Sequence, residues 1–474
     1  MLLRHSVIYF FARGVPGVIN FLALMIYTRL LVPEEYGQYA LTLTVVGFIN
    51  VVLWQWLRLG LLRFLTSYEG RQEAFLSTIA VSFLFLVIVS AGMFGLARLL
   101  FPEKYWLGLS ALALMLLWTQ AWFELNLELA RSRMSPLLYG GLASAKAITA
   151  IVIGVWLAYL GYGATGVLIG LLVALTVPGM WMLWRMWRVV RVHRIDREIF
   201  MHLVGYGLPL TATFALNFVL NSSDRLLIGW LMGAESVGLY AVGYDLASQT
   251  LGMLMAIINL ASYPIVVRKL ELQSEEAAKS QMQVNAALLL IVAMPVTVMW
   301  MQLAPNVAGV VVGDSYVDSA ASLMPIIALS TFIFGLQSHH FALAFQLGKR
   351  TVPQIWVMLL AALVNVVLNL LWIPAFGLMG AAYATLVACS VALVMSWLLG
   401  RSVFVVPMPS YTFKICIAVA VMALAIWPMA EWRGAAALAS QIVVGVIAYA
   451  AALLLLDVGN IRRRVNVRLA EMRQ

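Results

Sequence analysis

Charged residues are scarce in this chain. Asp, Glu, Lys and Arg together make up 11% of its 474 residues, whereas a soluble domain usually carries about 25%. Cysteine is scarcer still: Cys389 and Cys416 both fall inside long apolar runs, without the paired spacing of a disulfide framework or a metal site. The sequence therefore argues against a soluble globular fold and against thiol chemistry, and we expect no catalytic residues, no metal and no cofactor.

Apolar residues are abundant instead, at 64% of the chain. A bilayer core about 30 Å thick needs roughly 20 apolar residues per crossing helix, and runs of this length fill nearly the whole sequence. They predict an all-α polytopic membrane protein with fourteen transmembrane helices. The first run is longer than a signal-peptide core and lacks a small-residue cleavage site, so we include it as a spanning helix. The predicted spans are residues 6–31, 38–62, 74–97, 107–130, 137–160, 164–189, 203–232, 238–266, 283–303, 321–347, 353–374, 378–400, 411–430 and 434–457.

Cationic residues test this count independently, because Lys and Arg collect in short cytoplasmic loops. With the N-terminus inside, most of the 30 Lys and Arg residues fall in segments on the cytoplasmic side. An even number of helices then places both termini in the cytoplasm. The net charge of +10 does not indicate nucleic acid, because the cations lie beside apolar helices rather than on a basic domain. We expect them to contact anionic membrane lipid.

Two internal matches indicate that the chain is a duplication. Residues 29–41 align with 230–242 and pair Gly37 with Gly238, and residues 162–174 align with 376–388 and pair Gly163 with Gly377. Each match falls at an equivalent outer turn, so the repeated unit has six helices. Because six is even, the copies are parallel repeats related by an axis along the membrane normal.

The repeat predicts the domain organisation. We expect two six-helix lobes that can rock around a central site, followed by two further helices. The segments are an N-terminal lobe at 1–190, a basic cytoplasmic linker at 191–202, a C-terminal lobe at 203–400, helices thirteen and fourteen within 401–458, and a basic cytoplasmic tail at 459–474.

Four cations lie inside predicted spans: Arg13, Arg58, Lys146 and Arg225. Each charge costs about 2.5–3.5 kcal/mol at the bilayer centre, so such residues usually face a cavity or a partner. Arg58 is near a helix end and has snorkelling as its alternative, and Arg225 follows Asp224, which favours a structural pair with a neighbouring helix. Arg13 and Lys146 have no acidic residue nearby in sequence, which suits an anionic ligand such as a phosphate or diphosphate.

Polar residues recur on single helix faces within several predicted spans. We expect them to line a cavity, because spacings of three, four and seven return to one side of a helix. The expected lining residues are Asn20, Asn217, Asn221, Asp224, Asp245 and Asn365.

Two residues are candidates for proton coupling. Glu124 lies deep in the span 107–130, where burial favours the protonated carboxyl, and its alternative is a structural role. His339, next to His340, can either titrate or serve as a hydrogen-bonding group. No Cys or carboxylate at ligand spacing accompanies the histidines, so no metal site is expected.

Three segments carry a family resemblance: RLLVPEEYGQYAL after the first span, DRLLIGWLMGAESVGLYAVGYDLA at 224–247 and PAFGLMGAAYATLVA at 374–388. They resemble the polysaccharide and oligosaccharide flippases of Wzx type. That family belongs to the superfamily that also holds the multidrug and toxin extrusion transporters and the lipid II flippase.

The resemblance implies two lobes around a cationic cavity that opens alternately to each side of a bacterial inner membrane. The cargo would be an undecaprenyl-diphosphate-linked oligosaccharide repeat unit, flipped from the cytoplasmic to the outer leaflet for surface polysaccharide assembly. The four interior cations would neutralise the diphosphate. A polysaccharide polymerase and a chain-length regulator are the protein partners implied.

Three other functions are weighed against this one. A lipid II flippase fits the interior cations and is the principal alternative. A multidrug antiporter would be expected to carry an acidic residue in the first helix, where this chain has Arg13 and no acid. A membrane glycan polymerase or ligase needs a large extramembrane loop, and the longest outer loop, around 303–320, is too short.

Overall fold

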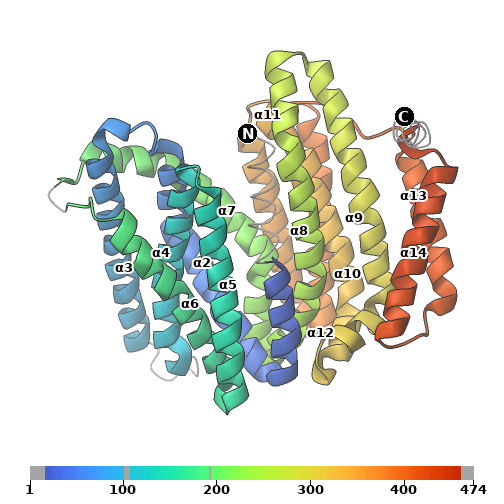
Figure 1. Cartoon of the computed structure of the whole chain (residues 1–474), viewed down its shortest axis with the longest axis horizontal. Coiled ribbons are helices and arrows are strands. Elements are labelled where there is room, and N and C mark those ends of the chain that lie inside the picture. The colour runs from blue at the N-terminus through green and yellow to red at the C-terminus, as the bar shows by residue number, and fades with distance from the viewer. Residues whose placement is uncertain (1–16, 101–106, 192–193, 461–474) are drawn as a thin grey trace, which may run out of the picture. The chain divides into compact units, whose positions relative to one another are not determined.

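The computed structural model describes residues 17–100, 107–191 and 194–460, and these residues form helices and connections without a strand (Figure 1). A first helix, Gly17–Leu30, precedes the labelled ones. The labelled helices are α2 (Pro33–Phe64), α3 (Gln72–Leu100), α4 (Leu107–Ser132), α5 (Pro136–Leu157), α6 (Gly163–Met186), α7 (Arg197–Met232), α8 (Ala234–Leu272), α9 (Glu275–Val311), α10 (Val317–Leu336), α11 (Leu343–Leu347), α12 (Val352–Gly400), α13 (Thr412–Ile426) and α14 (Ala435–Leu455).

Hydropathy located the helices correctly, and the all-α membrane fold is confirmed. Within the described residues, ten helical stretches are long and apolar enough to cross a bilayer. Two of them, Pro136–Met186 and Val352–Gly400, each contain two predicted spans. The total of fourteen spans stays a prediction, since part of the first expected helix lies outside the described residues.

Helix ends differ from the predicted ones where side chains cap the backbone. Asp196 accepts hydrogen bonds from the N–H groups of Glu198 (2.8 Å) and Ile199 (3.3 Å), so α7 begins six residues before the predicted span. Ser274 caps α9 in the same way through the N–H of Ala277, at 3.2 Å. At about 1.5 Å per residue, the 39 residues of α8 exceed what a bilayer core requires.

Glycines at the second repeat match share one unusual backbone conformation. Gly163 has φ +51° and ψ −137°, and Gly377 has φ +61° and ψ −140°. Side-chain-bearing residues rarely adopt this region. Each glycine breaks a helical stretch at the point where the sequence predicts an outer turn, so the two halves of the repeat turn alike.

Glycines at the first repeat match contact each other. A methyl group added to Gly37 would clash with the carbonyl oxygen of Ala234 and lie 2.9 Å from the nitrogen of Gly238. One added to Gly238 would clash with the carbonyl of Pro33 and lie 3.0 Å from the nitrogen of Gly37. Pro33 and Ala234 are themselves equivalent in the repeat, so the contact is reciprocal, as it is across a two-fold axis.

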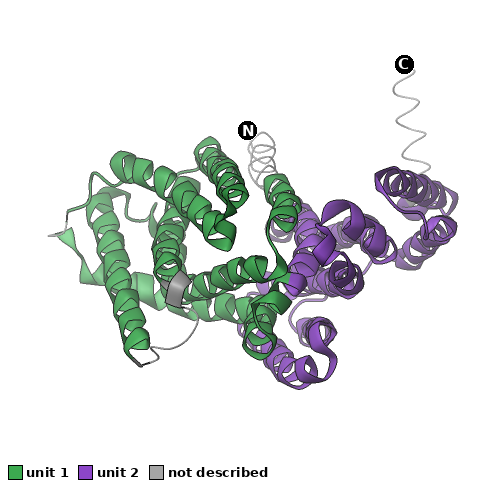
Figure 2. Cartoon of the chain, turned by 90° about the horizontal axis from the view of Figure 1, so that it is seen from below, with its two compact units in different colours: residues 1–238 green, residues 239–474 purple. Residues whose placement is uncertain are grey.

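The chain forms two compact units, residues 1–238 and 239–474 (Figure 2). In unit 1, α7 packs along α2, and Phe218 of α7 lies against Phe48, with ring centroids 5.7 Å apart. The sequence placed α7 at the start of the second lobe. The predicted boundary between the lobes at 191–202 differs from the boundary between the two units, and it stays a prediction.

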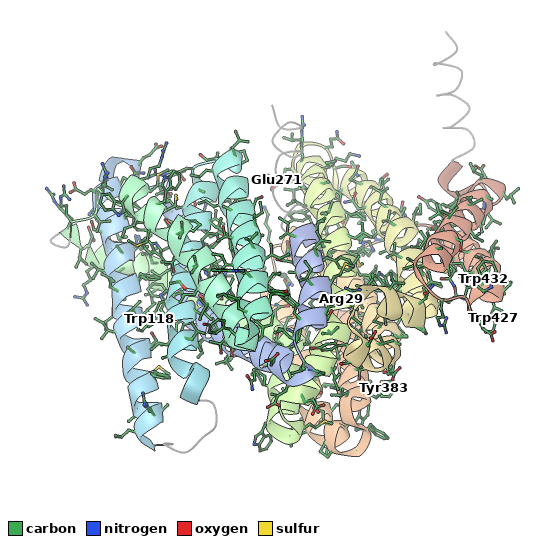
Figure 3. The ribbon with its side chains drawn as sticks, turned by 60° about the horizontal axis from the view of Figure 1, so that its bottom comes forward. Arg29, Trp118, Glu271, Tyr383, Trp427 and Trp432 are labelled. Carbon is green, nitrogen blue, oxygen red and sulfur yellow. The ribbon has the colours of Figure 1, made fainter. Side chains whose placement is uncertain are left out.

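Unit 1 is organised around an apolar core shared by the six helices α2 to α7. An aromatic chain crosses it: Phe83 lies 5.2 Å from Trp122, and Trp122 lies 4.9 Å from Trp187, between ring centroids. The indole N–H of Trp187 donates to Asn126 at 2.8 Å. Near the wall of an apolar pocket, Trp118 (Figure 3) donates to Ser90 at 3.0 Å. These buried contacts hold α4 firmly in place.

Unit 2 attaches α13 and α14 to α9 through buried amides. The side chain of Asn306 donates to Gln441 at 2.7 Å and accepts from the backbone N–H of Gly434 at 2.8 Å. Gln441 in turn donates to the carbonyl of Met429 at 2.6 Å. Trp432 lies with the exposed Trp427 at the connection between α13 and α14 (Figure 3). Aromatic residues concentrate at membrane–water interfaces, so we expect this end at the bilayer surface.

Candidate functional site

Two polar stripes face each other within unit 1. On α2, Asn50, Trp54 and Arg58 recur every fourth residue, and on α4 Gln120, Glu124 and Glu128 do the same. Residues four apart share one helix face, and α2 packs along α4. We call these six residues the α2–α4 polar cluster.

An ion pair between Arg58 and Glu124 is at the centre of the cluster. The Arg58 side chain is 8% exposed and that of Glu124 is 29% exposed. The Glu124 carboxylate also accepts hydrogen bonds from Asn50 and from Gln120, each at 2.9 Å. The carboxylate that the sequence offered as a proton-coupling candidate is thus held by three side chains from two helices.

Several buried polar atoms of the cluster have no hydrogen-bond partner among the described residues. They include the Nε and Nη2 groups of Arg58 and the indole nitrogen of Trp54, which are donors. The side-chain oxygen of Asn50 and Oε2 of Glu128 are the corresponding acceptors. Because more than 90% of buried polar groups in proteins are paired, unmatched groups on neighbouring turns mark a place that accommodates water or a polar ligand.

Lys146 lies on α5, which also packs on α4. Its Nζ is 5.5 Å from the centre of the Phe123 ring, and Phe123 directly precedes Glu124. Among the described residues, no carboxylate lies within ion-pair distance of Lys146. Two predicted cations, Arg58 and Lys146, therefore lie against consecutive residues of one helix.

The polar residues of α7 also belong to unit 1. Asn217 and Asn221 are half-buried, and their amides donate to the carbonyls one turn earlier, at 2.9 and 2.7 Å. Asp224 is 1% exposed and Arg225 is half-buried, and each has an interaction partner. The amide N–H groups of Asn217 and Asn221 thus bond within α7 itself.

Other predicted residues are not members of the α2–α4 polar cluster. Asn20 is exposed on the helix Gly17–Leu30, and Arg13 lies outside the described residues. In unit 2, Asp245 is half-buried on α8 and has a partner. His339 is half-buried in a π-helical turn, Gln337–Phe341, next to the buried His340.

Asn365 is placed in a seam between helices. It is fully buried, its amide lies 3.4 Å from the hydroxyl of Thr385, and it accepts from Asn369 at 3.1 Å. The contact with Thr385 joins the two parts of α12 on either side of Gly377. We therefore leave Asn365 out of the site that we propose below.

Asn50 and Trp54 are site residues that the sequence interpretation missed. Trp54 and Asn50 lie four and eight residues before Arg58, and this spacing, which places all three on one helix face, was the signal in the sequence. Each side chain is 1% exposed, which a single sequence does not reveal.

A family model described as "Polysaccharide biosynthesis protein" matches residues 26–321, well over half of the chain. The chain belongs to this family. A curated relative is the amylovoran biosynthesis protein AmsL of Erwinia amylovora, which is 22% identical over 179 residues. That alignment covers 38% of this chain and 45% of the relative, so less than half of the relative's length is matched.

Solved transporters share the fold of this family member. A lipid II flippase MurJ in an inward closed conformation gives a TM-score of 0.79 at 13% identity, covering 96% of this chain and 100% of the other. An inward-facing multidrug resistance MATE family transporter gives 0.63 at 15% identity, covering 83% and 97%. At these identities the likeness concerns the fold alone. The chain is therefore a multi-pass membrane protein of the polysaccharide biosynthesis family, with a fold that is also found in a lipid II flippase and in multidrug transporters.

Proposed function

We propose that this chain flips undecaprenyl-diphosphate-linked oligosaccharide repeat units from the cytoplasmic to the outer leaflet of a bacterial inner membrane. The observations that carry the proposal are the α2–α4 polar cluster and a second interior cation, Lys146, which contacts α4 at Phe123. There, two buried nitrogens of Arg58 are unmatched and Lys146 has no acidic partner among the described residues. A diphosphate supplies the negative charge and the acceptor oxygens that these groups require.

Arg58 would change partners during transport. In the structure it is paired with Glu124, which satisfies one end of its guanidinium. A guanidinium has five N–H donors in a planar fork that matches phosphate oxygens, so the free edge can bind cargo before the Glu124 bond is broken. Arg13, Lys146 and Arg225 would share the remaining charge of the diphosphate.

The membrane potential favours this direction. With the cell interior negative, each anionic charge carried outward gains about 2.3 kcal/mol per 100 mV. The lobes at 1–190 and 203–400 would rock around the site, with helices thirteen and fourteen outside the repeat and both termini in the cytoplasm. A polysaccharide polymerase and a chain-length regulator would act on the flipped unit.

A lipid II flippase is the second candidate. It is favoured by the TM-score of 0.79 to MurJ over nearly the full length of both chains. The polysaccharide biosynthesis match over residues 26–321 and the name of the AmsL relative favour an oligosaccharide cargo instead. Both cargoes carry a polyprenyl diphosphate, so the cluster does not distinguish between them.

Surface glycan in cells that depend on this chain tests the proposal. Arg13→Ala and Lys146→Ala are expected to lose surface glycan while the protein still inserts at normal levels. Arg98→Ala is the matched control, because it removes one exposed positive charge from the same unit. Normal surface glycan in both of the first two variants would contradict a diphosphate site at these cations.

A further inference from the structure

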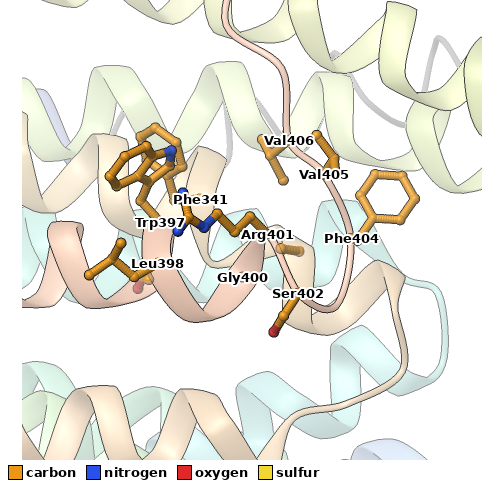
Figure 4. A pocket seen from close by; sticks show the side chains of 11 residues that line it. Phe341, Trp397, Leu398, Gly400, Arg401, Ser402, Phe404, Val405 and Val406 are labelled. Atoms are coloured by element: carbon orange, nitrogen blue, oxygen red, sulfur yellow. The ribbon is translucent and has the colours of Figure 1, made fainter.

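Residues of unit 2 alone form a cleft. It has a volume of about 720 Å³ and lies between the π-helical turn, the last turn of α12 and the chain that follows (Figure 4). Its walls are mainly apolar and aromatic, and its polar side chains are two serines and one arginine. The apolar lining consists of Phe341, Ala344, Trp397, Leu398, Phe404, Val405 and Val406.

Arg401 provides the positive charge of the cleft. Its guanidinium carbon lies 5.2 Å from the centre of the Trp397 ring, one helical turn earlier, so the guanidinium is held over the indole (Figure 4). No carboxylate of the described residues lies within ion-pair distance of Arg401. An exposed guanidinium fixed on an aromatic ring and lacking an acid is well suited to bind a phosphate.

The last carbonyls of α12 are hydrogen-bonded within the connection that follows the helix. Carbonyls at a helix C-terminus carry partial negative charge, and two of these carbonyls accept hydrogen bonds here. The carbonyl of Gly400 accepts from the N–H groups of Val403 and Phe404, both at 2.9 Å, and that of Leu399 accepts from the Ser402 hydroxyl at 2.7 Å.

The cleft walls are held by buried contacts. Ser396 is fully buried and accepts a hydrogen bond from Gln337 at 3.0 Å. Phe404 is 7% exposed and packs into an apolar cluster with Val266 and Met282. On that side, Lys279 lies 5.7 Å from the centre of the Phe404 ring, adding a second cation near the cleft, although it also pairs with Glu275 at 2.6 Å.

We propose that this cleft binds an anionic glycerophospholipid, with the phosphate on Arg401 and an acyl chain along the apolar wall. A lipid is favoured over a water-soluble phosphate because seven apolar side chains line the cleft and Trp397 is 48% exposed. Other cations lie close to this part of the chain in sequence, namely Lys349, Arg350 and Lys414. Anionic lipid gathers at such basic membrane surfaces. The site is independent of the cargo proposed above.

Native mass spectrometry of the purified full-length protein tests this site. We expect retained phosphatidylglycerol to exceed retained phosphatidylcholine, and Arg401→Ala to weaken phosphatidylglycerol binding by about five- to tenfold. Arg433→Ala is the matched control, because it removes the same charge from an exposed position of the same unit that is neither in the cleft nor among these basic residues. Arg401→Lys, which keeps the charge but not the planar stack on Trp397, should fall between wild type and Arg401→Ala.

Two outcomes would overturn the proposal. One is equal phosphatidylglycerol binding by the wild type and Arg401→Ala, in variants whose melting temperatures agree. The other is displacement of phosphatidylglycerol by inorganic phosphate at the same concentration, which would assign the site to a free anion rather than to a lipid.

Discussion

Gly37 and Gly238 lie backbone to backbone, and they are equivalent positions of the two aligned segments 29–41 and 230–242. A side chain at either glycine would clash with backbone atoms in the first turn of the helix that carries the other glycine. A reciprocal contact of this kind is what a two-fold relationship between duplicated segments produces. The repeat found by sequence is thereby tied to a physical contact.

Alanine at Gly37 should therefore be poorly tolerated. The added methyl group meets backbone atoms of Ala234 and Gly238, which cannot move aside as a side chain can. We expect a loss of about 1–3 kcal/mol or more of stability, seen as a lower melting temperature in detergent. Gly92→Ala is the control, because nothing lies within 4 Å of its added methyl group. Equal melting temperatures for the two variants would contradict the contact.

The Arg58–Glu124 pair should show strong energetic coupling. Removing one partner of a buried ion pair costs about 3–5 kcal/mol, because the other charge stays buried and unpaired. Arg58→Ala and Glu124→Ala are each expected to lower the melting temperature, and the double variant to lose less than the two losses added together. Simple additivity would indicate that the two side chains do not interact.

Protonation of Glu124 should release Arg58 toward an anionic cargo. The groups that act on this carboxylate are Arg58, Asn50 and Gln120, with Glu128 one turn away. If the release is part of transport, wild-type flipping rises as the pH falls. Glu124→Gln, which mimics the protonated state, should be active and much less dependent on pH. A pH profile unchanged by Glu124→Gln would exclude this residue from coupling.

The attachment of α13 and α14 should depend on Gln441. Gln441→Leu leaves the buried amide of Asn306 and the carbonyl of Met429 without their partner, at about 1–3 kcal/mol per unsatisfied group. We expect faster hydrogen exchange in α13 and α14, with α2–α6 unaffected. Ser440→Ala serves for comparison, because its hydroxyl bonds only within its own helix, to Ala437. Exchange that is equally slow in both variants would contradict the role of this network.

Hydropathy predicted where the helices lie because lipid requires long apolar runs, and this requirement is local in sequence. Helix ends are decided by other forces. The Asp196 cap started α7 early, and α8 continues to Leu272, past the charged Arg268 and Lys269, since a helix need not end where the membrane does.

The candidate site was only partly accessible from sequence. Arg58 and Glu124 were each identified as unusual, but their pairing joins helices far apart in the chain and no spacing rule predicts it. Asn365 had the polar pattern of a cavity wall, yet the turn at Gly377 folds α12 back so that Asn365 meets Thr385. Polar periodicity indicates a shared face without telling whether that face meets cargo or another helix.

Flipping by the purified protein in liposomes tests the central claim most directly. With a fluorescent oligosaccharide on undecaprenyl diphosphate, wild type should move the label across the bilayer. Arg58→Ala and Lys146→Ala should each be at least about tenfold slower, since each removes a charge-assisted contact of about 1.5–3 kcal/mol. Wild-type rates in both variants, or no translocation by the wild type, would contradict a flippase that holds the diphosphate at these two cations.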